Sequence, residues 1–207
     1  MEVIEFENTA ASTILIQPVD NFDLAGLERE IDWIKKSCPG DFGLLAVKVD
    51  SWNQDLSPWK AAAVFGKEDF GQGAQKTLDF ILNLCHAPGK KYFLGGYSLA
   101  GLFSLWAGFQ TDLFSGIGAA SPSAWFPSFT DYAENHPCKC KNIYLSLGDR
   151  EEKTKNPVMS KVGECILQIK ETLENQGIQT YFEWNPGNHF KDSDLRTAKA
   201  FSYLLGE

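Results

Sequence analysis

The sequence lacks any uninterrupted apolar stretch close to the roughly 18 residues that a membrane-spanning helix requires. It also lacks, near residue 1, the basic segment followed by an apolar one that is typical of a secretory signal. We therefore expect no membrane partner and a cytoplasmic location.

Basic residues are scarce relative to acidic ones. There are 19 lysines and arginines against 27 aspartates and glutamates, so the formal net charge at pH 7 is −8. A surface of this sign repels phosphate backbones and anionic lipids. This excess of negative charge predicts that nucleic acid is not a partner.

Cysteines are few and widely spaced. The chain has five, an odd number, and the single residue between Cys138 and Cys140 does not match common spacings of zinc ligands. The pattern favours reduced structural thiols, as expected in the cytosol, over a metal or redox site.

The chain shows no internal repeat, low-complexity segment or linker. With 207 residues and 43% hydrophobic residues, it can bury one sizeable core. We predict a single domain over residues 1–207.

Strand-like and helix-like segments alternate along the whole chain, which is typical of a mostly parallel sheet with helices on both faces. We predict an α/β fold, with Asp23 as the cap of its first helix. The expected strands cover residues 13–19, 42–49, 92–96, 115–120, 142–147 and 180–184, and the expected helices 24–34, 74–85, 99–109, 158–173 and 195–205.

Reactive side chains in such a sheet are expected just after the strands, at their carboxyl ends. Ser98 lies in Gly96-Tyr97-Ser98-Leu99-Ala100, between an apolar strand and an apolar helix. Small residues on either side leave room for a sharp turn that exposes the serine hydroxyl. The N–H of Leu99, at the start of the helix, is placed to stabilise an oxyanion. An ordinary serine N-cap is the alternative.

The chain has only three histidines. His86 is expected at a helix end and His136 in a polar loop, whereas His189 follows the last strand. Together with a serine after a strand, His189 is the better candidate for a general base.

An acid that orients the imidazole is expected between these two residues in the sequence. The strand that ends at residue 147 is followed by Gly148-Asp149-Arg150-Glu151-Glu152. Glu151 is one candidate for this acid. Asp149 is the alternative, although a short carboxylate directly after the glycine more naturally binds backbone N–H groups.

These motifs resemble the α/β-hydrolase superfamily, and within it the esterase family that includes esterase D and the enterochelin esterases. The residues that carry the resemblance are Gly95-Gly96-Tyr97-Ser98-Leu99-Ala100-Gly101, Phe114-Ser115-Gly116 leading to Ser121-Pro122, and Gly187-Asn188-His189. The resemblance covers roughly residues 13–205. It implies a single-domain α/β-hydrolase without a large lid. It also favours Glu151 as the acid, because hydrolases of this fold often carry the acid three residues after the glycine that ends the strand, here Gly148.

The sequence departs from this family at two places. Ala100 replaces the usual second glycine, and the strand end before Asn21 lacks the usual His-Gly or Asp-Gly. A second oxyanion donor is therefore assigned to Asn21 by position alone. Two tryptophans that follow strands, Trp52 and Trp125, are candidates for a substrate-binding wall, with aromatic packing as the alternative.

The resemblance implies a serine hydrolase that cleaves small-molecule carboxylic esters and needs neither a cofactor nor a metal. Acyl transfer or thioester hydrolysis by the same residues, and a non-catalytic binding module on the same fold, are the alternatives. The oligomeric state is left open.

Overall fold

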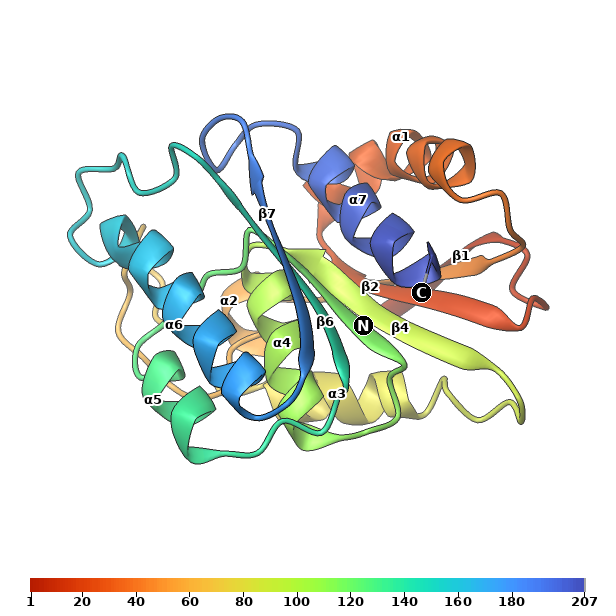
Figure 1. Ribbon diagram of the computed structural model, residues 1–207, viewed down its shortest axis with the longest axis horizontal. Helices are drawn as coiled ribbons and strands as arrows, with labels where there is room; N and C mark the ends of the chain where they lie inside the picture. Colours follow the sequence, from red (N-terminus) through yellow and green to blue (C-terminus); the bar gives the residue numbers. More distant parts are fainter. Residues whose placement is uncertain (207) are drawn as a thin grey trace.

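The protein, described here over residues 1–206 of a computed structural model, is built on one seven-stranded sheet (Figure 1). The strand order is β1-β3-β2-β4-β5-β6-β7, and every pairing is parallel except that of β1 with β3. The predicted α/β class and mostly parallel sheet are confirmed. Glu207, the last residue of the predicted domain, lies outside the described residues. The strands are β1 (Glu2–Glu7), β2 (Thr13–Val19), β3 (Gly43–Lys48), β4 (Lys91–Tyr97), β5 (Gly116–Ala120), β6 (Asn142–Gly148) and β7 (Gln179–Asn185).

Helices cover both faces of this sheet. Figure 1 shows α1 and α7 side by side, and their apolar residues form one core cluster with β2, β3 and β4. The other helices belong to a second, larger cluster on the opposite face. The helices are α1 (Asn21–Ser37), α2 (Trp52–Asp55), α3 (Ala74–Leu82), α4 (Leu99–Gln110), α5 (Phe129–Asn135), α6 (Val162–Asn175) and α7 (Ser193–Gly206).

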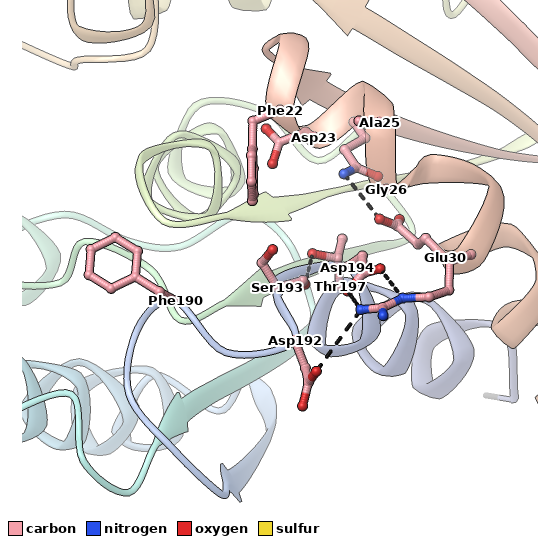
Figure 2. A pocket seen from close by; sticks show the side chains of 12 residues that line it. Phe22, Asp23, Ala25, Gly26, Glu30, Phe190, Asp192, Ser193, Asp194 and Thr197 are labelled. Carbon is pink, nitrogen blue, oxygen red and sulfur yellow. Dashed lines mark hydrogen bonds and ion pairs between the residues drawn. The ribbon is translucent and has the colours of Figure 1, made fainter.

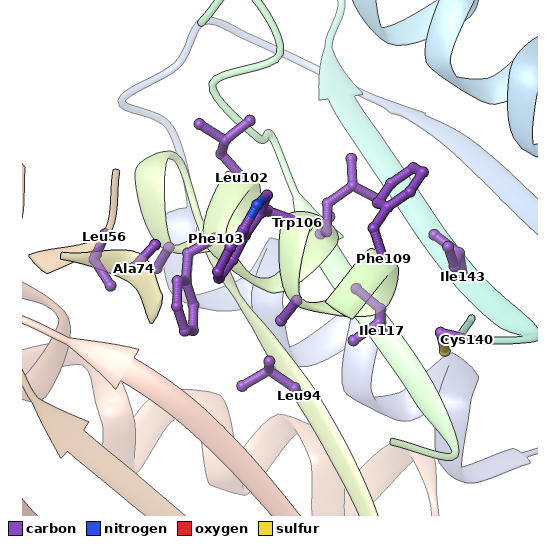
Figure 3. Close-up of a cluster of buried hydrophobic side chains, with 14 of the residues drawn as sticks. Leu56, Ala74, Leu94, Leu102, Phe103, Trp106, Phe109, Ile117, Cys140 and Ile143 are labelled. Atoms are coloured by element: carbon purple, nitrogen blue, oxygen red, sulfur yellow. The ribbon is translucent and has the colours of Figure 1, made fainter. Parts of the chain in front are cut away.

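The central helix α4 is apolar around its whole circumference. Every residue from Leu99 to Phe109 is buried, as expected for a helix enclosed by its neighbours. Figure 3 shows Phe103, Trp106 and Phe109 of α4 in one cluster with Leu94, Ile117 and Ile143 of the neighbouring strands, whereas Leu102 lies on the other side of the helix. This packing holds the amino end of α4 rigidly at the end of β4.

The structure corrects several predicted elements. β1 was not predicted, because its order of charged and apolar residues becomes a strand only through its pairing with β3. The short helices α2 and α5 were also missed. The cap of α1 is Asp20 rather than Asp23, which instead completes a capping box. The helix expected from residue 158 begins at Val162, after a 3₁₀ turn at Met159–Lys161.

No large lid covers the sheet in the part of the chain described. Apart from the helices that pack against the sheet, the connections between strands carry only the short helices α2 and α5 and a 3₁₀ turn. Within residues 1–206, no helix is both long and apolar enough to cross a bilayer.

Candidate active site

Ser98 lies on a sharp turn between β4 and α4. Its backbone has φ 56° and ψ −118°, a strained conformation for a residue with a side chain. The turn brings strand and helix so close that a Cβ on Gly96 would lie 2.7 Å from the Ala100 Cβ. A Cβ on Gly101 would lie 2.9 Å from the Gly96 carbonyl oxygen. The small residues of this motif are therefore required by the close approach of the two elements.

The structure brings together three of the residues singled out in the sequence. The Oγ of Ser98 lies 3.0 Å from Nε2 of His189, and Nδ1 of His189 lies 2.6 Å from Oε2 of Glu151. His189 comes from the loop between β7 and α7, and Glu151 from the turn after β6. The arrangement is the hydrogen-bonded serine, histidine and acid that nucleophilic catalysis uses.

Asp149 has a different place. It is exposed, and its Oδ1 accepts the Gly187 N–H at 2.7 Å. This bond ties the turn after β6 to the loop that carries His189. The preference for Glu151 over Asp149 therefore has geometric support, and the expected role of Asp149 as a turn-fixing acceptor matches its position.

These positions predict opposite outcomes for two substitutions. Glu151→Gln removes the charge that faces the imidazole, so we expect kcat to fall by about 10³–10⁴-fold. Asp149→Ala removes only a loop contact, so we expect a lower melting temperature and kcat within about tenfold of the parent. Both are measured at a temperature at which circular dichroism shows each variant folded. A larger loss of kcat in Asp149→Ala than in Glu151→Gln would give the acid's role to Asp149.

Glu151 is almost fully enclosed and binds several donors. Its Oε1 accepts hydrogen bonds from the Gly148 N–H, the Ser121 hydroxyl and the Arg196 guanidinium, each at 2.7 Å. Burial alone would raise the pKa of this carboxyl. The hydrogen bonds and charge of His189, with those from Ser121 and Gly148, outweigh burial and lower its pKa below the usual value. Glu151 is therefore held as a carboxylate.

Sequence reasoning missed Ser121 and Arg196 as parts of this site. Ser121 is fully buried with φ 43°, and its hydroxyl binds the acid rather than standing free as a second nucleophile. Arg196 precedes the buried Ala200 by four residues and so lies on the same face of α7. A charged residue on this apolar face is the only signal for Arg196 in the sequence.

Ser123, also missed, lies on the other side of Ser98. Its N–H binds the Ser98 carbonyl at 3.0 Å, and the two hydroxyl oxygens are 3.4 Å apart. This contact orients the segment after β5 along the turn that carries Ser98.

The two expected oxyanion donors both lie at helix amino ends. Leu99 is the first residue of α4, directly after Ser98. Asn21 is the first residue of α1, and the capping side chain of Asp20 takes the N–H groups of Phe22 and Asp23 but not that of Asn21. The N–H of Asn21 thus stays outside the capping box. Its role as a donor remains a prediction.

Comparison with solved structures decides the fold. EstA, a siderophore hydrolase from Aspergillus nidulans, matches with a TM-score of 0.68 at 18% identity, over 95% of this chain and 82% of that one. The enterobactin esterase FES from Shigella flexneri matches with 0.64 at 12%, over 99% of this chain and 55% of that one. A Bacillus cereus carboxylesterase matches with 0.62 at 12%, over 99% and 94%. The chain has the α/β-hydrolase fold.

The likeness is one of structure rather than of sequence. No protein-family model matches the chain, and no curated protein resembles it significantly in sequence. The resemblance to α/β-hydrolases inferred from the motifs is confirmed for the fold.

The two tryptophans proposed for substrate binding pack into the larger core cluster of the fold. Trp125 is 7% exposed, with its ring centroid 6.0 Å from that of Phe65 and 6.1 Å from that of Phe70. Trp52 begins α2 and is partly buried against the same cluster. These contacts favour the packing interpretation, and a role in substrate binding remains a prediction.

A cavity of about 390 Å³ lies between α1 and the start of α7, and Phe190, from the loop that carries His189, lines it (Figure 2). Figure 2 shows Phe22 and Phe190 on one side of it and Glu30 on the other. Both phenylalanines are largely exposed. The polar lining residues are Gln17, Asp23, Arg29, Glu30, Asp192, Ser193, Asp194 and Thr197.

Glu30, in the wall of this cavity, is only 2% exposed. Burial raises its pKa well above the ordinary 4.5, an effect that the hydrogen bond from Gln17 reduces. Above pH 4.5 the unfolded chain loses this proton while the folded chain keeps it, so this group's contribution to stability falls as the pH rises.

We therefore expect Glu30→Gln to be more stable than the parent at pH 8, with a smaller difference at pH 5. The urea midpoint of each protein at both pH values measures this. Glu28→Gln, an exposed neighbour on α1, is the matched control and should leave the pH dependence unchanged. Equal pH dependence in Glu30→Gln and the parent would contradict the burial argument.

Neither a metal site nor a disulfide is found in the part of the chain described. No group of three or more His, Cys, Asp or Glu there is placed to hold a metal ion. The five cysteines, all within it, are free thiols, and burial raises the pKa of Cys85 and of Cys138 to about 12. Such thiols are unreactive near neutral pH.

Proposed function

We propose that this protein is a serine hydrolase that cleaves small-molecule carboxylic esters through an acyl-enzyme on Ser98. The observation that carries the proposal is the continuous hydrogen-bonded line from Ser98 Oγ through His189 to Glu151, at 3.0 and 2.6 Å. The names of the structural neighbours, a siderophore hydrolase, an enterobactin esterase and a carboxylesterase, support ester hydrolysis.

The first half of the reaction forms the acyl-enzyme. His189 Nε2 takes the proton of Ser98 as Oγ bonds to the ester carbonyl carbon. The carbonyl oxygen becomes an oxyanion, which the N–H of Leu99 and, as we propose, that of Asn21 stabilise. When the intermediate collapses, the carbon–alkoxy bond breaks and His189 returns its proton to the leaving alcohol.

The second half releases the acid. His189 takes a proton from a water molecule, whose oxygen attacks the acyl carbon. The bond to Ser98 Oγ then breaks and His189 returns the proton to the serine. Glu151 stays ionised throughout and stabilises the imidazolium that forms twice in the cycle.

Part of the substrate has space in the cavity lined by Phe22 and Phe190. The ring centroid of Phe190, which lines the cavity, lies 5.6 Å from that of His189, and this contact supports placing part of the substrate there. The exposed phenyl rings favour an apolar or aromatic acyl or alcohol group.

The negative net charge supports the proposal that neither nucleic acid nor membrane is a partner. The five free thiols support a cytoplasmic location.

The proposal is tested with a fluorophosphonate probe and a set of p-nitrophenyl esters of varied chain length, extended to aryl esters. We expect one label per chain, located by mass spectrometry on Ser98, and release of p-nitrophenol. Added alcohols distinguish hydrolysis from acyl transfer, because a transferase forms the new ester faster than the free acid. A folded protein that takes up no label would instead support a non-catalytic binding module.

A further inference from the structure

Arg196 is the largest of the fully enclosed side chains in the described part of the protein. It lies in the first turns of α7 and is 2% exposed. Burying a guanidinium costs several kcal/mol unless its charge is paired and its N–H groups are bound. The identity of its partners therefore indicates what the residue does.

Each partner of Arg196 belongs to the candidate active site or to the loop that carries it. Nη1 donates to Glu151 Oε1 at 2.7 Å, to the Ser121 hydroxyl at 3.0 Å and to the Tyr97 hydroxyl at 3.1 Å. Nη2 donates to the carbonyl of Asn188 at 3.0 Å and to that of Pro186 at 3.3 Å. The guanidinium thus binds the acid and both sides of the turn before His189.

Tyr97 extends this network to the base itself. Its hydroxyl accepts from Arg196 and donates to the carbonyl of His189 at 2.6 Å. Tyr97 directly precedes the nucleophile. One buried cation therefore connects, through at most one intervening group, to Glu151, to His189 and to the residue before Ser98.

Gly148, at the end of β6, leaves space for the guanidinium because it has no side chain. A Cβ on Gly148 would lie 2.9 Å from both Nη atoms of Arg196 and 2.4 Å from the Gly187 carbonyl oxygen. Only glycine leaves room for the guanidinium at this point. The glycine that ends the strand and the arginine of α7 therefore form one structural unit.

We propose that Arg196 is a positioning residue for the reaction at Ser98: its guanidinium keeps Glu151 ionised in one orientation and thereby sets the pH range in which His189 accepts the serine proton. This inference rests on the proposed function. It adds a fourth member to the site, one that acts through Glu151 and touches no reacting atom.

His189 and Glu151 form a hydrogen-bonded pair whose total charge depends on the protons it holds. The pair is net negative when His189 is neutral, and net neutral when the pair holds one more proton. Arg196 stabilises the negative form, which is the form in which His189 can act as a base. Without the arginine the pair should keep its extra proton to higher pH.

Few other charges reach this carboxylate. The titratable and charged groups that face Glu151 are His189 from the loop after β7, Arg196 from α7 and Tyr97 from β4. Its neighbours on the turn, Asp149, Arg150 and Glu152, are exposed and thus screened by solvent.

The experiment compares Arg196→Met, Arg196→Lys and the control Arg150→Met. Arg150 lies one residue from Glu151, so the control removes the same charge from the exposed side of that turn. For each protein, kcat and kcat/KM for p-nitrophenyl acetate and the rate of fluorophosphonate labelling are measured from pH 5 to pH 9.

We expect Arg196→Met to move the acidic limb of both profiles to higher pH by about one unit or more, as Coulomb's law predicts for charges a few ångströms apart. Arg196→Lys keeps the positive charge but loses the planar set of N–H donors. The acidic limb of its pH profile should therefore stay at the parental pH, while kcat falls about tenfold or more. Arg150→Met should match the parent within about twofold. Superimposable profiles for Arg196→Met and the parent, or a parental kcat in Arg196→Lys, would overturn the inference.

Arg196→Met could fail to fold, because it leaves a buried carboxylate unpaired. The double variant Arg196→Met/Glu151→Gln carries neither the guanidinium nor the carboxylate charge. If this double variant folds, the unpaired carboxylate is the reason that Arg196→Met does not. A parental profile and kcat in Arg196→Lys would still overturn the inference. If the parent neither cleaves esters nor takes up the probe, the proposed function and this inference are both overturned. If the parent is active and the pH profiles of the Arg196 variants and their kcat values match those of the parent, this inference alone is overturned.

Discussion

Ser98→Ala is expected to lower kcat for p-nitrophenyl esters by about 10⁵–10⁶-fold, the loss typical of a serine nucleophile that acts with its histidine. The contacts of the Oγ atom contribute little to stability, because they are made within the site: His189 Nε2 lies at 3.0 Å and the Ser123 hydroxyl at 3.4 Å. The circular dichroism spectrum and the melting temperature should therefore stay close to those of the parent. Labelling by the fluorophosphonate should disappear.

Ser98→Gly provides a matched comparison. It should be as inactive as the alanine variant, yet more stable, because glycine adopts a φ of 56° without the strain that a side chain imposes. A higher melting temperature for Ser98→Gly than for Ser98→Ala would show that the backbone at Ser98 is strained. Turnover within tenfold of the parent in both variants would place the nucleophile elsewhere.

His189→Ala is expected to reduce kcat nearly as much as Ser98→Ala, and the double variant should lose little more. Residues that act as one unit show such non-additive losses, because the hydroxyl is a poor nucleophile once its base is gone. The measurements are kcat for the same esters and the rate of fluorophosphonate labelling, which should fall in parallel.

His86→Ala and His136→Ala are the controls. Both side chains are exposed, and His136 stacks on Tyr132, with ring centroids 4.1 Å apart, at the end of α5. Neither substitution should change kcat by more than about twofold. Loss of activity in either control, with activity retained in His189→Ala, would contradict the assignment of the base.

Local sequence patterns predicted the elements on which the site is built. The alternation of strands and helices follows from short-range periodicity, and the turn at Ser98 from the need for small residues where β4 meets α4. The order of serine, acid and histidine, each after a strand, indicated which side chains would share one edge of a parallel sheet. The choice of Glu151 over Asp149 came instead from the resemblance, since hydrolases of this fold often carry the acid three residues after this glycine.

The remaining features depend on residues far apart in the chain, which no local pattern can relate. β1 is a strand because it pairs with β3 at the edge of the sheet. The Ser121 hydroxyl binds Glu151 because the turn after β6 lies next to it. Arg196 lies 45 residues from Glu151 in the sequence, and its buried charge finds this partner only when α7 packs against the end of β6. Periodicity records which face of an element is apolar, whereas the pairing of a buried charge is decided by which elements meet in three dimensions.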